Sequence, residues 1–74
     1  MATYTEVHNL EINIFNSLEA AYKAINVRDR DNAKAYIVSV EVLNEEYKEI
    51  TQQDFVKPEN ILKLYEKLWE VSNA

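Results

Sequence analysis

The chain contains no glycine and no cysteine among its 74 residues, and it has a single histidine and a single proline. Tight β-hairpins and phosphate-binding loops need residues without a Cβ, so the absence of glycine disfavours both. Without cysteine no disulfide can form, and one histidine leaves too few ligands for a structural zinc site. These absences favour a helical protein that is stabilised by packing or by self-association.

Positive charge is also scarce, because 8 lysines and arginines stand against 13 aspartates and glutamates, a net charge of −5. This balance argues against direct binding of nucleic acid and is compatible with a basic protein partner. No apolar run approaches the length that spans a membrane. The first residues show neither the basic region nor the apolar stretch of a secretion signal. We therefore expect a cytoplasmic protein that does not associate with membranes.

Apolar residues make up 47% of the chain, enough for a folded domain, and the length allows one domain over residues 1–74. The spacing predicts a first helix over about residues 4–25. Thr3 and Glu6 match a capping box at its start, and Asn26 is a candidate left-handed residue at its end. Its apolar stripe recurs at three- and four-residue steps: Val7, Leu10, Ile14, Leu18, Ala21 and Ile25, widened by Phe15 and Tyr22.

A second helix is predicted over about residues 32–51, after a charged loop over 28–32 that supplies an aspartate or asparagine N-cap. Its predicted contact seam has heptad spacing: Ala33, Tyr36, Val40, Leu43, Tyr47 and Ile50, with Ile37 beside it. Tyr36, Val38, Val40 and Val42 alternate along the chain and would also suit a strand, because β-branched residues favour strands. The helix is favoured because the seam continues through the charged residues 44–49, which are poor strand formers.

Pro58 suits the first turn of a third helix, predicted over about residues 58–72. Its expected stripe consists of Ile61, Leu62, Tyr65, Leu68 and Trp69. Short loops make neighbouring helices antiparallel, so the sequence predicts an all-α fold, a small three-helix bundle with two long antiparallel helices and a shorter third. The third helix is too short to cover the other two, and the apolar surface left over favours a homodimer.

The aromatic side chains fall on or beside these predicted stripes. We expect Phe15, Tyr22, Tyr36, Tyr47, Tyr65 and Trp69 to pack in the core, since base-stacking platforms combine exposed aromatic residues with basic ones. This interpretation again disfavours binding of single-stranded nucleic acid.

The candidate functional surface is the face of the second helix opposite its seam. Glutamates recur there at four-residue spacing, although like charges at that spacing repel each other. Two valines stand among them, which is unusual on a charged face. The candidate partner-binding residues are Val38, Glu41, Val42, Glu45, Glu46 and Glu49. The alternative interpretation is a solvated face with two scattered surface valines.

Other candidate sites are weaker. His8 and Glu11 lie one turn apart on the first helix, and Glu11 interrupts the apolar stripe, where a carboxylate would need a partner or solvent. Asp29, Asp31 and Asn32 resemble a calcium loop only in part, because the required glycine is missing. No serine has a base at a recognisable spacing. We therefore predict no catalytic residue, no metal site and no cofactor.

The sequence thus predicts a non-enzymatic protein–protein interaction module, a small adaptor or inhibitor that presents a helix face to a protein partner. One alternative is an acidic DNA-mimic inhibitor of a nucleic-acid-binding protein, whose binding would weaken steeply with salt. Another alternative is a structural, self-assembling component, which would associate with itself and with no other protein.

Overall fold

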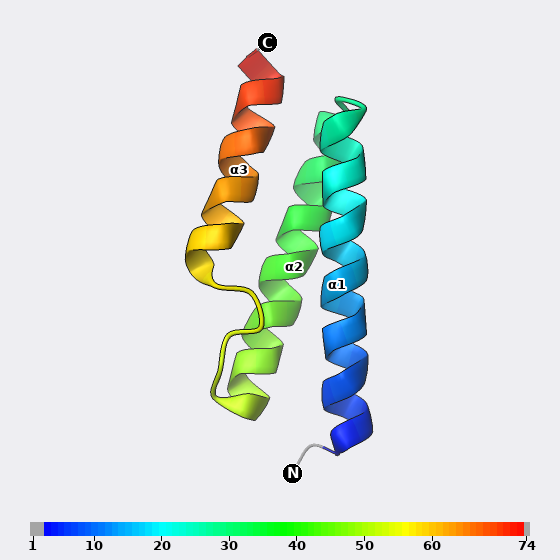
Figure 1. The fold of residues 1–74 in the computed structure, drawn as a ribbon, viewed down its shortest axis with the longest axis vertical. Helices are drawn as coiled ribbons and strands as arrows, with labels where there is room; N and C mark the ends of the chain where they lie inside the picture. Colours follow the sequence, from blue (N-terminus) through cyan, green and yellow to red (C-terminus); the bar gives the residue numbers. More distant parts are fainter. Residues whose placement is uncertain (1–2, 74) are drawn as a thin grey trace.

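The computed structural model describes residues 3–73 and confirms the predicted all-α fold. Within these residues it contains three helices and no strand: α1 (Tyr4–Asn26), α2 (Arg30–Thr51) and the shorter α3 (Pro58–Asn73). Figure 1 shows α1 and α2 side by side and antiparallel, with α3 running back along the upper half of α2. The boundaries agree with the predicted ones within about two residues.

Local side-chain chemistry explains where the helices begin. The Thr3 hydroxyl accepts a hydrogen bond from the Glu6 backbone N–H at 3.2 Å, which confirms the predicted N-cap of α1. Asp29 caps α2 in the same way, accepting from the Asn32 backbone N–H at 3.4 Å. Because Asp29 is the cap, α2 begins at Arg30, two residues before the predicted start. Pro58 is the first residue of α3, as predicted.

The prediction that Asn26 adopts the left-handed conformation at the end of α1 is wrong. Asn26 remains helical, and the residue with positive φ is Arg28, at 59°. The turn therefore lies two residues later and is very short. The Val27 backbone N–H donates to the Lys23 carbonyl at 3.2 Å, and the Asp29 N–H donates to the Ala24 carbonyl at 2.8 Å, so the last carbonyls of α1 are satisfied.

The core consists of two clusters along α2. The upper cluster packs the small residues of α1 and α2 against α3: Ala21, Ala24, Ala33, Ile37, Leu64 and Leu68. The lower cluster joins α1, α2 and the second connection: Leu10, Ile14, Val40, Tyr47 and Val56. Alanines bring α1 and α2 close together in the upper cluster, and larger side chains fill the lower one.

The predicted seam of α2 is rotated toward α3. Ala33, Ile37, Val40 and Tyr47 are buried as expected and Asn44 completes the buried stripe, whereas Tyr36 and Ile50 are exposed. The centre of the stripe has turned by about half of the 100° that separates neighbouring residues on a helix. The reason is that α3 packs beside α1 on α2, which moves the centre of the contact stripe toward α3.

The expectation that six aromatic side chains pack in the core is wrong for four of them. Tyr47 is buried and Tyr65 is half-buried, but Phe15 and Trp69 are 60% and 70% exposed, and Tyr22 and Tyr36 are also exposed. The stripe of α3 changes too, because Leu64 is its most buried residue and Leu62 is exposed. The physical reason on α1 is that α3 meets α1 only through the upper cluster and its backbone lies closer to α2, so the side of α1 that carries Phe15 and Tyr22 is not covered.

The connection between α2 and α3 is fixed by a buried asparagine that the pattern did not indicate. Gln52 ends α2 in the left-handed conformation, with φ of 64°. The chain then returns along α2, where the Asn44 side chain binds the backbone of Phe55 and Val56. Val56 is thereby placed in the lower core cluster.

The resulting molecule is long and flat. Its Cα atoms extend 46 Å along the helices but only 12 Å in the thinnest direction. Three helices side by side form a layer with two broad faces. One face carries a groove between α1 and α2, and another groove lies between α1 and α3.

Candidate protein-interaction surface

The two valines singled out from the sequence lie on the solvent side of α2. Val38 is 43% exposed and Val42 is 59% exposed. Both line a shallow groove of about 480 Å³, which we call the α1/α2 groove. Its residues come from both long helices: Asn13, Asn16 and Ser17 from α1, and Val38, Ser39, Val42 and Leu43 from α2.

The α1/α2 groove is lined without any charged side chain, although 28% of the chain is charged. Two serines and two valines are among the residues that line it, and such short side chains allow another helix to approach closely. Ser39 directs its hydroxyl to the Ala35 carbonyl at 3.1 Å, so this group is satisfied within α2. Depletion of charge with exposed apolar side chains is typical of the centre of a protein interface.

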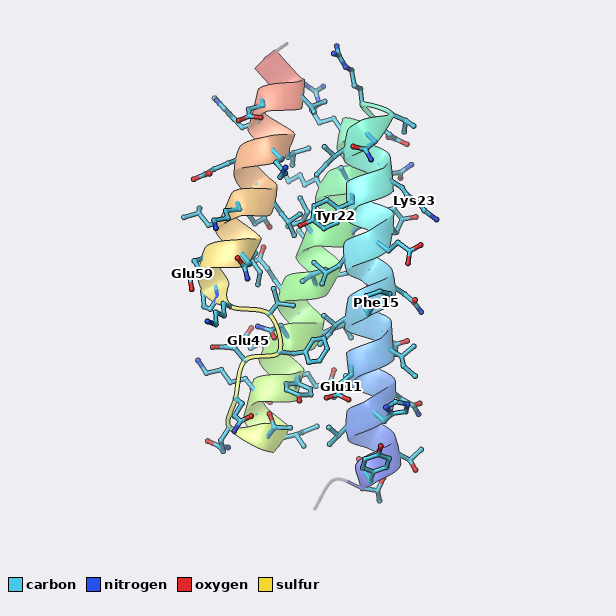
Figure 2. All side chains as sticks on the ribbon, in the orientation of Figure 1. Glu11, Phe15, Tyr22, Lys23, Glu45 and Glu59 are labelled. Carbon is cyan, nitrogen blue, oxygen red and sulfur yellow. The ribbon has the colours of Figure 1, made fainter. Side chains whose placement is uncertain are left out.

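Three of the predicted glutamates border the two valines. Glu45, Glu46 and Glu49 are exposed on the C-terminal half of α2. Glu45 projects away from α1 (Figure 2), and the helical rotation of 100° per residue places Glu46 on the opposite flank of the valines. The surface therefore has an apolar centre with acidic side chains along two of its edges.

Glu41, the remaining predicted residue, lies apart from this surface. It is exposed, but its carboxylate accepts a hydrogen bond from the Tyr65 hydroxyl of α3. Partial burial of the tyrosine, together with this carboxylate, raises the pKa of Tyr65 to about 12. Glu41 thus connects α2 to α3, and we leave it out of the proposed surface.

Glu11 has a partner that the sequence interpretation did not foresee. The Tyr47 hydroxyl donates to Glu11 Oε2 at 3.0 Å, and His8 Nδ1 lies 3.7 Å from Oε1. The hydrogen bond to Glu11, followed by burial, raises the pKa of Tyr47. This explains why a carboxylate interrupts the apolar stripe of α1: it satisfies the hydroxyl of a buried tyrosine.

The described residues offer no arrangement for metal chemistry. No group of three or more histidine, aspartate or glutamate side chains between residues 3 and 73 is placed to hold a metal ion. Asp29, from the run that resembles a calcium loop, is used as the helix cap, and its second oxygen accepts from Asn32 Nδ2 at 2.6 Å.

Comparisons with protein-family models, with curated proteins and with solved structures found no match for this chain. Among the described helices, none combines the length and apolar character required to cross a membrane.

Proposed function

We propose that the protein is a non-enzymatic interaction module that binds a helix of a protein partner in the α1/α2 groove. The observation that carries this proposal is the exposed pair Val38 and Val42 in a groove without charged side chains. An amphipathic helix that lies in such a groove buries its own apolar stripe against the two valines and Leu43.

The charges at the border specify the partner. Glu45, Glu46 and Glu49 flank the apolar centre, so a partner helix with lysine or arginine beside its apolar stripe complements this surface. Opposite charges at the border accelerate association and set the orientation, while burial of the apolar centre supplies the affinity.

The exposed area of the chain is also consistent with a surface that a partner covers. A compact monomer of 8.7 kDa exposes about 4,700 Å², whereas this chain exposes 5347 Å². The excess is about 600 Å². The flat shape of the helical layer accounts for this excess.

A synthetic helix of about five turns, with a leucine stripe flanked by lysines, is a suitable probe, here called the lysine peptide. We expect it to bind with micromolar affinity in a fluorescence anisotropy titration. Val38→Asn with Val42→Asn should weaken binding at least tenfold, because asparagine has the helix propensity of valine but removes the apolar contact. The matched control is Leu62→Asn, since Leu62 on α3 is 59% exposed, as Val42 is.

Two results would contradict the proposal. If the lysine peptide bound the Val38→Asn, Val42→Asn variant as tightly as the Leu62→Asn control, the valines would not be at the interface. The second result is a dimer in light scattering that becomes a monomer in the Val38→Asn, Val42→Asn variant. This result would assign the groove to a second copy of the chain.

A DNA mimic would bind a lysine–serine peptide without the leucine stripe as tightly as the lysine peptide, and this binding would disappear at high salt.

A further inference from the structure

We propose that a second surface, the groove between α1 and α3, binds an acidic amphipathic helix of a protein partner. This groove is separate from the α1/α2 groove and contains none of its residues. It exists because α3 meets α1 only through the buried side chains of the upper cluster, which leaves a groove of about 420 Å³ above them. We call it the α1/α3 groove.

The floor and sides of the α1/α3 groove are apolar. Leu18, Val56 and Leu64 lie at its base, and all three belong to, or pack against, the core. Tyr22 from α1 and Phe55 from the second connection line it and are 47% and 39% exposed. Large aromatic side chains that remain half in solvent are the usual anchors of protein interfaces.

The apolar stripe continues along α1 beyond the groove. Phe15, Leu18 and Tyr22 follow each other at steps of three and four residues, the spacing that meets another helix along its length. Figure 2 shows Phe15 and Tyr22 on the same side of α1, while Lys23 projects away at the outer edge. An occupant that lies parallel or antiparallel to α1 therefore contacts all three side chains, which favours a helix over an extended peptide.

Two lysines on α3 specify the charge of this occupant. Lys63 and Lys67 line the groove, are exposed and lie one helical turn apart. Within the part of the chain that the structure describes, neither makes an ion pair. Glutamates or aspartates at i and i+4 beside the apolar stripe of a bound helix would meet both ammonium groups.

The probe is a glutamate peptide, which has the same leucine stripe as the lysine peptide but glutamates in place of its lysines. We expect the Lys63→Glu, Lys67→Glu variant to bind the glutamate peptide at least tenfold more weakly than the unchanged chain does. The same variant should bind the lysine peptide at this groove. The matched control is Lys23→Glu with Lys34→Glu, which gives the same net charge but changes lysines that do not line the groove. Tyr22→Ala should weaken binding at least fivefold without changing the helix content measured by circular dichroism.

Amide chemical shifts of the folded chain locate the site directly. The glutamate peptide should perturb residues 15–22 and 60–67 and leave residues 38–43 unchanged, so failure here is distinguishable from failure of the proposal for the α1/α2 groove. The inference is overturned if the peptide does not bind at millimolar concentration, or if both lysine double variants bind it equally. It is also overturned if the chain forms a dimer in which a second copy fills the groove. In that case the Tyr22→Ala substitution would convert the dimer to a monomer.

Discussion

The side-chain amide of Asn44 in α2 forms hydrogen bonds with both the N–H and the carbonyl of Val56. Its Nδ2 donates to the Val56 carbonyl at 3.0 Å, and its Oδ1 accepts from the Val56 N–H at 2.9 Å. The same oxygen accepts from the Phe55 N–H at 2.9 Å. Among the described residues, Asn44 is the one buried polar residue. It supplies hydrogen-bond partners for backbone groups of an irregular segment, which has no helix or strand to satisfy them.

We expect Asn44→Ala to lower the free energy of unfolding by about 2–4 kcal/mol, because it leaves buried backbone groups of Val56 without partners. Urea denaturation followed by circular dichroism measures this change. Asn9→Ala, at an exposed position on α1, controls for the higher helix propensity of alanine. If the two variants had equal stability, the amide of Asn44 would not be holding the second connection in place.

The contact between Glu11 and Tyr47 should couple α1 to α2. We expect Glu11→Leu and Tyr47→Phe each to destabilise the fold, with a coupling energy of about 0.5–1.5 kcal/mol in a double-mutant cycle. The physical reason is that leucine leaves the hydroxyl of a buried tyrosine without its acceptor. Strict additivity of the two substitutions would show that the hydrogen bond contributes nothing. Glu66→Leu, at an exposed position within α3, serves as the comparison.

Stability should fall in strongly alkaline solution. The pKa of Tyr65 is raised to about 12 by partial burial and by Glu41, whereas in the unfolded chain it is 10.0. Between these values the folded state holds more protons than the unfolded state, so the free energy of unfolding is unaffected below pH 10 and decreases as the pH rises toward 12. Absorbance titration of tyrosinate should show a transition near pH 12 that Tyr65→Phe removes. A transition near pH 10 for Tyr65 would mean that its contact with Glu41 is absent in solution.

Periodicity, caps and Pro58 were sufficient to predict the three helices. Thr3, Asp29 and Pro58 act through local hydrogen bonds and backbone geometry, which a linear sequence displays. Val38 and Val42 were also placed correctly on the solvent side, since a position opposite the core remains exposed when the stripe rotates by about half of a 100° residue step.

The packing of α3 could not be predicted in the same way. Whether α3 packs equally against α1 and α2 or mainly against α2 depends on the path of residues 52–57, and Asn44 fixes the end of that path. An asparagine within an apolar stripe could have been recognised as a buried polar residue, which needs several partners. The exposure of Phe15 and Tyr22 follows from the same arrangement, so the α1/α3 groove was not visible in the pattern.

The most direct test of the proposed function is to introduce negative charge at the centre of the α1/α2 groove. The variant Val38→Glu with Val42→Glu should keep its helix content, because both side chains are largely exposed. We predict that the lysine peptide does not bind this variant in an anisotropy titration. The apolar contact has been removed, and the added negative charge does not replace it. Tighter binding by this variant would contradict the account, because it would show that charge alone attracts the partner.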